Sequence, residues 1–242
     1  MRVLVLSDIH ANLTALQAVL AAAGKVDATW CLGDLVGYGP DPNECIDLIQ
    51  EQPGLVCLKG NHDAAACDQI GVDGFNADAR VSVKWLRAVI SEASLRFLRA
   101  LPDQSIQGNV TLVHGSPRNP IWEYIQDART ASENFEFFTT DFCLVGHTHV
   151  ALLYLQPDGV AFAHPALPSF LEGESLQPRA ILNPGSVGQP RDRDSRAAFV
   201  IFDPETKLWE QHRVAYDIAS VQKRIIKAKL PSRHAARLSG GW

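Results

Sequence analysis

The stretch VLVLSDIH at residues 3–10 places a carboxylate and an imidazole just after a short apolar run. The arrangement recurs after the apolar runs at residues 28–32, 55–58, 110–113 and 142–145, which lead into the fragments GD, GNHD, H and GHTH. Short runs rich in Val, Leu and Cys that end at Gly or Asp predict buried strands. Ligands of an open α/β sheet gather beyond the carboxyl ends of its strands. We therefore expect the five polar fragments to converge on one site.

The overall composition predicts one soluble domain spanning residues 1–242. The chain is 46% hydrophobic and 20% charged, which is ordinary for a globular protein. A net charge of -5 argues against a nucleic-acid surface or an anionic membrane surface as partner. No apolar run approaches the ~20 residues of a membrane span. The chain also enters its first strand without the features of a secretory signal, so we expect a cytoplasmic location.

The first half of the chain predicts a parallel sheet. Residues 2–60 have a β-α-β-α-β pattern, with Asn12 as the cap of a first helix that stops at Gly24. Residues 64–101 show helical spacing without strand signals. We expect this segment to be a helical insertion over the mouth of the site.

The second half predicts antiparallel sheet. Residues 152–155 and 160–163 flank Pro157-Asp158-Gly159, a hairpin signal, and residues 197–202 and 208–214 flank another turn. A final amphipathic helix over Ile218–Lys229, with its Arg233–Arg237 tail, is expected to serve packing and surface only. A layered α/β fold with two sheets and outer helices accommodates this order.

The polar fragments supply more potential metal ligands than one ion needs. There are seven: Asp8, His10, Asp34, Asn61, His114, His147 and His149. One tetrahedral ion would use four, whereas two ions ~3.5–4 Å apart that share a carboxylate would use them all, with Asp34 as the bridge. Nitrogen ligands disfavour magnesium and calcium and suit manganese, iron, zinc, cobalt or nickel. The positive charge of two such divalent ions exceeds the negative charge of two carboxylates and one bridging hydroxide. The centre should therefore attract an anion such as a phosphate ester.

Neighbouring residues suggest how a phosphate ester would react. Metal-bound water loses its proton near pH 7 and becomes a nucleophile. His62 follows a ligand candidate directly, and a positioned imidazole suits a general acid for the departing alkoxide. Asp63 is expected to accept the ring N–H of His62 and fix its tautomer. Three arginines beyond the HGSP and NPGS loops could clamp phosphate oxygens or be solvated surface charges: Arg118, Arg191 and Arg193.

Together these fragments resemble the calcineurin-like metallophosphoesterase superfamily, whose ordered pattern is D-x-H, G-D, G-N-H-D/E, H and G-H-x-H. The resemblance covers roughly residues 2–202 and implies a four-layer α/β/β/α sandwich of two mixed sheets. It implies one metal on Asp8, His10, Asp34 and His149, and the other on Asp34, Asn61, His114 and His147. The stretches SDIHANL, GDLVGYGP and NPGSVGQP, which begin at residues 7, 33 and 183, are similar to a bacterial-type predicted phosphodiesterase branch.

The function expected from this resemblance is that of a dinuclear metal-dependent phosphodiesterase, with manganese preferred, acting on a small phosphate ester. A phosphomonoesterase and a diadenosine-tetraphosphatase-like hydrolase are alternatives. Protein Ser/Thr phosphatases carry Asp-Arg-Gly after the second motif, where this chain has Gly37-Tyr38-Gly39. Another alternative is a non-catalytic metal-binding scaffold of the same fold, but such scaffolds typically lack the histidine that stands here as His62. The remaining histidines, His164, His212 and His234, are expected to pack or face solvent, and the oligomeric state is open.

Overall fold

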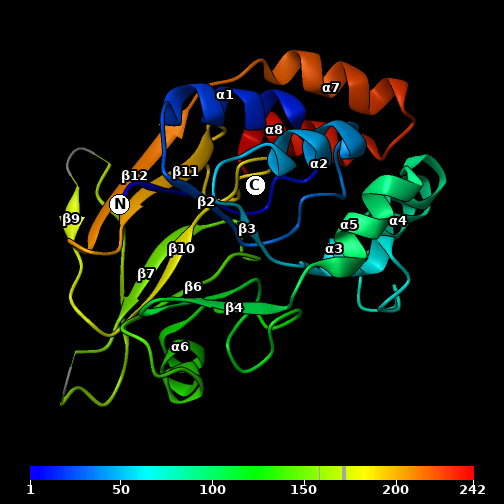
Figure 1. Ribbon diagram of the computed structural model, residues 1–242. Coiled ribbons are helices and arrows are strands. Elements are labelled where there is room, and N and C mark those ends of the chain that lie inside the picture. The colour runs from blue at the N-terminus through cyan, green and yellow to red at the C-terminus, as the bar shows by residue number, and fades with distance from the viewer. Residues whose placement is uncertain (158, 171–172) are drawn as a thin grey trace.

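Two mixed sheets form the centre of the computed structural model, which describes residues 1–157, 159–170 and 173–242 (Figure 1). Within these residues each sheet has six strands. The first sheet has the order β3 (Val56–Cys57), β2 (Ala28–Cys31), β1 (Val3–Leu6), β11 (Ala197–Asp203), β12 (Leu208–Val214) and β9 (Glu174–Ser175). The second has the order β4 (Gln104–Gln107), β5 (Val110–Val113), β6 (Phe142–Leu144), β10 (Ala180–Pro184), β7 (Ala151–Leu155) and β8 (His164–Ala166).

Helices cover the outer faces of both sheets (Figure 1). On the side of the first sheet lie α1 (Leu13–Ala23), α2 (Pro42–Gln50), α7 (Ile218–Lys227) and α8 (Ser232–Gly240). On the side of the second sheet lie α6 (Ala128–Asn134) and the 3-10 helix η1 (Phe135–Phe137). At one end of the sandwich stand α3 (Asn61–Ala66), α4 (Ala77–Val89) and α5 (Glu92–Ala100).

Three apolar cores separate the layers, and β1 shows how one strand serves two of them. Successive side chains of a strand point to opposite faces. Leu4 and Leu6 join the core beneath α1 and α2, whereas Val3 and Val5 face the second sheet. A third core lies between the second sheet and α6 with η1. The predicted α/β/β/α sandwich is therefore confirmed. Because β1 lies between two apolar cores, its side chains are apolar on both faces.

Strand direction brings the polar fragments to one edge. In the first sheet β1 runs parallel to β2, and β2 runs parallel to β3. In the second sheet β5, β6 and β10 are parallel neighbours. The first helix starts as predicted, because the Asn12 side chain accepts a hydrogen bond of 3.1 Å from the Ala15 N–H. It ends at Gly24, whose φ is 65°.

Two details of the second half differ from the sequence prediction. The hairpin partner of β7 is β8 at His164–Ala166 rather than residues 160–163, because the Gln156 side chain donates to the carbonyls of Val160 and Ala161. Asp158 of the expected turn lies outside the described residues. The Arg233–Arg237 segment is not a tail, since it lies within α8.

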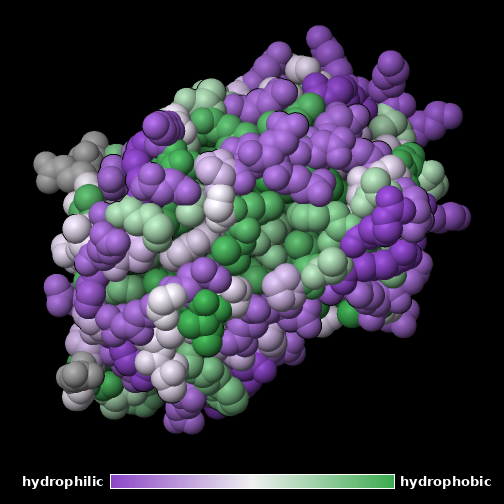
Figure 2. Space-filling view, viewed as in Figure 1, coloured by the Kyte–Doolittle hydropathy of each residue, from purple (hydrophilic) through white to green (hydrophobic). Residues whose placement is uncertain are grey.

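The helical segment 64–101 contains the end of α3 together with α4 and α5. Its role as an insertion, and the single-domain organisation of residues 1–242, stay predictions. Hydrophilic side chains cover the surface along α7 and α4, whereas hydrophobic ones gather in the middle of this face (Figure 2). Among the described residues, no helix has the length and apolar character needed to cross a lipid bilayer.

Candidate metal centre

All seven predicted ligands lie together at the strand ends. Asp8 and His10 follow β1, Asp34 follows β2, and the others come after β3, β5 and β6. Each is at most 4% exposed. Ligand atoms of Asp8, His10 and His149 lie within 4.8 Å of one another, and so do those of Asp34, His114 and His147. Two compact ligand groups therefore form side by side, and a third set of such atoms joins His62 to His10 and Asp34.

The backbone turns sharply to point these side chains inward. Five of the seven residues have positive φ, between 49° and 65°: Asp8, His10, Asp34, His147 and His149. Non-glycine residues in this region cost on the order of 1–3 kcal/mol each, and such strain clusters at functional sites. Backbone hydrogen bonds between the loops hold the turns, since the Asp8 N–H donates to the Gly33 carbonyl and the His10 N–H donates to the Asp34 carbonyl.

The histidines present lone pairs to one another. The Nδ1 atom of His10 lies 3.1 Å from the Val36 carbonyl, and that of His149 lies 2.7 Å from the Gln189 carbonyl. A carbonyl only accepts, so each Nδ1 carries the proton and each Nε2 keeps its lone pair. These two Nε2 atoms are 3.1 Å apart. Lone pairs at that distance repel, but about 3 Å is the separation of two nitrogens bound to one ion by ~2.1 Å bonds.

A second pair of imidazoles, those of His114 and His147, belongs to the other ligand group. Nδ1 of His114 lies 2.9 Å from the Leu32 carbonyl, and its Nε2 lies 3.1 Å from Nδ1 of His147. Within the described chain, three buried atoms of the seven ligand residues have no hydrogen-bond partner: Asp8 Oδ1, Asn61 Oδ1 and His147 Nε2. Buried polar atoms without partners are costly. Because a bound cation would satisfy these atoms, the residues fit divalent metal ions.

The pKa values of three of the four ligand histidines also suit metal binding. Burial lowers the pKa of His10, His147 and His149 well below the ordinary value, so these imidazoles are neutral at pH 7, as ligands must be. Burial raises the pKa of Asp8 to about 6. For His114, burial lowers the pKa, but Asp34 outweighs this effect and raises it to about 9.

These values predict that the affinity for Mn²⁺ rises with pH. Below its pKa, His114 must release a proton before it can bind an ion, and the Asp8 carboxyl must do the same in acid. Release of one proton from His114 corresponds to a roughly 100-fold gain in affinity between pH 6 and pH 8 for the ion that His114 binds. Asp8 is already about half ionised at pH 6 and adds only about two-fold for the other ion. Calorimetry in two buffers of different ionisation enthalpy measures both the affinity and the proton release. A constant affinity without proton release would contradict this prediction.

His62 lies beside the ligand groups, as predicted. Its ring is 3% exposed, and its backbone N–H donates to Asp34 Oδ1 over 2.9 Å. The ring lies 4.4 Å from that of Tyr38, and Nδ1 has no partner in the described chain. A Cβ at residue 37 would collide with this nitrogen, which explains why Gly37 stands there with a φ of 95°. Burial lowers the pKa of His62 to about 4.

The predicted contact between Asp63 and the His62 ring is wrong. Asp63 Oδ2 accepts from the Gly60 N–H over 2.9 Å, and Oδ1 accepts from the Val36 N–H over 3.2 Å. Asp63 is the third residue of α3, so its carboxylate folds back to cap the helix. Burial raises its pKa to about 7. Asp63 thus ties the loop after β2 to the start of α3.

The three candidate arginines have different surroundings. Arg191 borders the same cavity as Asp34 and His62, and its backbone N–H donates to the His149 carbonyl over 3.2 Å. Arg118 is held by Glu123 and, at 2.9 Å, by Glu133. The side chain of Arg193 is exposed. Arg191 is therefore the arginine of the three that the fold brings to the ligand groups.

Sequence reasoning missed the aromatic wall of the site. The cavity beside the ligands, of about 50 Å³, is also lined by Tyr38, Phe75, Asn76, Trp122 and Tyr124. Tyr124 stacks on the His147 ring with a centroid distance of 3.7 Å. Only Tyr38 lies near a motif, in Gly37-Tyr38-Gly39. The others lie in loops and helix ends without periodic spacing, so no sequence signal marks them.

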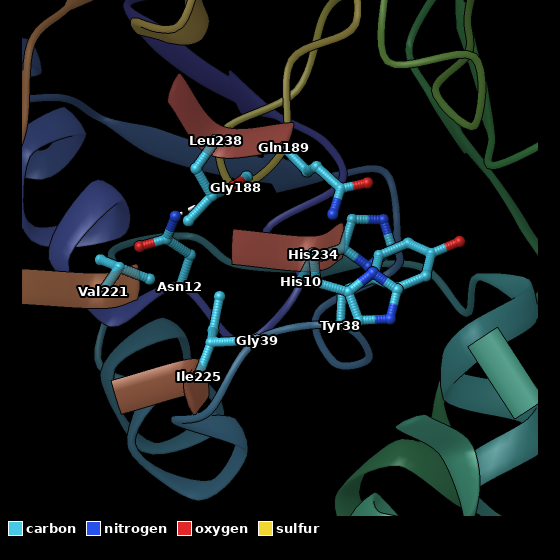
Figure 3. Close-up of a pocket in the computed structure, with 10 residues that line it drawn as sticks. All are labelled: His10, Asn12, Tyr38, Gly39, Gly188, Gln189, Val221, Ile225, His234 and Leu238. Atoms are coloured by element: carbon cyan, nitrogen blue, oxygen red, sulfur yellow. Dashed lines mark hydrogen bonds between the residues drawn. The ribbon is translucent and has the colours of Figure 1, made fainter. Parts of the chain in front are cut away.

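His234 is packed in the interior, as expected, and it lies close to the site. Its ring lies 4.7 Å from that of Tyr38, and its Nε2 lies 2.8 Å from Ser82 Oγ. A small cavity of about 10 Å³ separates α7 and α8 from the loops of the metal centre (Figure 3). His164, by contrast, is exposed in β8.

Comparisons with known proteins agree with the geometry. The model of the calcineurin-like phosphoesterase superfamily domain matches residues 1–207. An uncharacterized protein from Methanocaldococcus jannaschii is 36% identical over 243 residues, which cover 97% of this chain and 96% of that protein.

Solved structures also resemble the chain. The crystal structure of a metallophosphoesterase from Sphaerobacter thermophilus is 46% identical, with a TM-score of 0.89 and coverage of 100% of this chain and 99% of that one. A hypothetical protein from Pyrococcus horikoshii, at 21% identity, shares the fold with a TM-score of 0.77 over 100% and 98% of the two chains. The similarity to the Sphaerobacter thermophilus protein therefore extends through α7 and α8, beyond the residues that the family model matches.

Proposed function

This chain belongs to the calcineurin-like phosphoesterase superfamily, and we propose that it is a phosphodiesterase that uses two divalent ions, with manganese preferred. One observation carries the proposal: Asp34 lies between the two ligand groups. Its Oδ2 is 3.6 Å from Nε2 of His10 in one group and 3.4 Å from Nε2 of His114 in the other. A carboxylate in this position is suited to serve two ions.

The residues around the ligand groups supply the remaining steps. When bound at such a site, two divalent ions provide an activated water nucleophile and stabilise charge on the phosphoryl oxygens. Arg191 then holds a phosphoryl oxygen, since its guanidinium borders the same cavity. Burial lowers the pKa of His62 to about 4, so the imidazole acts as general acid from its minor protonated form, which the negative charge of a bound ester favours. His62 donates this proton to the leaving alkoxide.

The walls of the cavity favour a diester over a monoester. A diester carries a second organic group, and the aromatic side chains of Phe75, Trp122 and Tyr124 offer it a surface beside the ligands. A diester also bears one negative charge, which the single arginine Arg191 matches. The preference rests on these two features of the cavity.

Metal removal and replacement test the proposal. After chelation the protein is expected to hydrolyse neither bis-p-nitrophenyl phosphate nor p-nitrophenyl phosphate, and Mn²⁺ is expected to restore turnover of the diester at two ions per chain. A faster restored rate on the monoester would favour the phosphomonoesterase alternative. Binding of two ions without turnover of either ester, for Mn²⁺, Fe²⁺, Zn²⁺, Co²⁺ and Ni²⁺ alike, would favour a scaffold.

A further inference from the structure

The C-terminal helix α8 lies directly against the candidate metal centre, although the family model ends at residue 207. His234 and Leu238 of α8 line the same small cavity as His10 and Tyr38, and His234 lies beside these two residues (Figure 3). The Tyr38 ring contacts three imidazole rings. These are the ring of His234 in α8 and the rings of His62 and His10 at the metal centre, whose centroids lie 4.4 Å and 4.6 Å from that of Tyr38. One aromatic ring thus separates α8 from the proposed proton donor.

Arg237 lies on the same face of α8, because it follows His234 by three residues. Its Nε atom is buried and has no hydrogen-bond partner in the described chain, and the same holds for Nε of Arg191. Arg224, by contrast, is paired with Asp41 at 2.9 Å. Burial lowers the pKa of Arg237, and the positive charge of Arg191 lowers it further. The two guanidinium groups therefore repel each other electrostatically.

The loop that carries Arg191 fixes the position of α8. The Arg193 N–H donates to the Gly241 carbonyl over 2.7 Å, and the Gly241 N–H donates to the Arg237 carbonyl over 2.9 Å. Gly241 has a φ of 61° and ends the helix in the left-handed conformation that favours glycine. The backbone of Arg193, rather than its side chain, therefore sets the spacing between Arg191 and Arg237.

A groove of about 530 Å³ extends the site along α8. It is lined by Asn76, Ala77, Asp78, Arg233 and Arg237. Asn76 also borders the cavity of the metal centre, so the two spaces adjoin there. Two arginines and one carboxylate, that of Asp78, line the groove, and Arg191 and the carboxylate of Asp34 line the adjoining cavity. The combined surface is therefore positively charged.

We propose that Arg237 and Arg233 form a second anion subsite beside the metal centre, and that the natural substrate carries a second phosphate group which binds there. The inference rests on the proposed phosphodiesterase function and names its substrate class: a phosphodiester that bears a further phosphoryl group. Guanidinium groups bind phosphate through paired hydrogen bonds. Arg191 then holds the scissile phosphate, and Arg237 holds the second one.

Equilibrium binding of two nucleotides to the Mn²⁺-loaded protein tests the subsite by calorimetry. Adenosine 5′-monophosphate and adenosine 3′,5′-bisphosphate differ only in the second phosphate. The bisphosphate is expected to bind about ten-fold more tightly. In Arg237→Gln this preference is expected to fall below about two-fold, while the affinity for the monophosphate stays unchanged. Arg233→Gln, which alters an exposed side chain and leaves the fold intact, is expected to weaken bisphosphate binding about three-fold.

Arg96→Gln is the matched control, because Arg96 is an exposed arginine of α5 that borders neither cavity. It is expected to leave both affinities unchanged. Equal binding of the two nucleotides by the unaltered protein, or an equal effect of Arg96→Gln, would overturn the subsite. Because binding needs no turnover, a protein that prefers the bisphosphate but hydrolyses no diester would support the subsite and overturn the phosphodiesterase proposal. Diester hydrolysis by a protein that does not prefer the bisphosphate would support the phosphodiesterase proposal and overturn the subsite.

Discussion

An Asp34→Asn variant is expected to lose about 1,000-fold in Mn²⁺-dependent turnover of bis-p-nitrophenyl phosphate and to bind fewer than two ions. The reason lies in the contacts of the carboxylate. Oδ1 accepts from the His62 N–H, while Oδ2 faces Nε2 of His10 and Nε2 of His114. An amide oxygen that keeps the bond to His62 leaves the amide NH₂ facing the two imidazoles. It would donate to the lone pairs that the ions need.

The matched control for this variant is Asp47→Asn, which makes the same chemical change at an exposed residue of α2. It is expected to keep full turnover and both ions. Metal analysis after gel filtration counts the ions, and thermal unfolding without metal shows whether each variant is folded. If Asp34→Asn bound two ions with unchanged affinity, Asp34 would not serve both ligand groups.

The sequence predicted the ligand groups because their placement follows from strand direction. Parallel strands end at the same edge of a sheet, so polar residues that follow neighbouring parallel strands lie near one another. Asp8 and Asp34 illustrate this, since each follows one of two neighbouring parallel strands. Predicting that these ligands lie together required only the order of the strands and no other long-range information. For the same reason the two-sheet fold was predictable from the apolar runs.

Asp63 shows where a local signal was present but given the wrong meaning. Gly60 followed three residues later by an acidic residue is typical of a helix N-terminus, at which the acidic side chain bonds back to the backbone. The structure has this arrangement, with Asp63 bound to the Gly60 N–H. Helix capping competes with every other use of such a carboxylate. A neighbour in sequence was therefore a poor guide to the partner of the His62 ring.

Tyr124 and Arg237 show what the sequence did not contain. Tyr124 reaches the site by stacking on His147, and Arg237 reaches it because α8 is bound to the loop after residue 190. Both contacts join segments that are distant in sequence and that carry no motif. The short edge strand β9, at Glu174–Ser175, was likewise not predicted, since it has no apolar pattern. Such placements depend on the packing of whole elements rather than on local residue order.

Replacing His62 with Ala is expected to impair hydrolysis according to how much the leaving group needs a proton. Methyl phenyl phosphate and methyl p-nitrophenyl phosphate differ only in the leaving phenol, and p-nitrophenolate departs readily without protonation. Loss of a general acid typically costs about 10²–10⁴-fold, so this loss is expected for the phenyl ester. For the p-nitrophenyl ester the loss is expected to stay below about ten-fold. Steady-state kinetics on both esters with the same Mn²⁺-loaded preparation measure the difference.

Metal content decides between the two roles open to His62 by geometry. Its ring nitrogen lies within 4.8 Å of ligand atoms of His10 and Asp34, so it could also bind an ion. A proton donor leaves both ions in place when it is removed, whereas a ligand does not. His62→Ala with two ions and a leaving-group-dependent loss would therefore fit proton transfer. Equal losses on the two esters, with both ions retained, would instead assign His62 to holding the phosphoryl group.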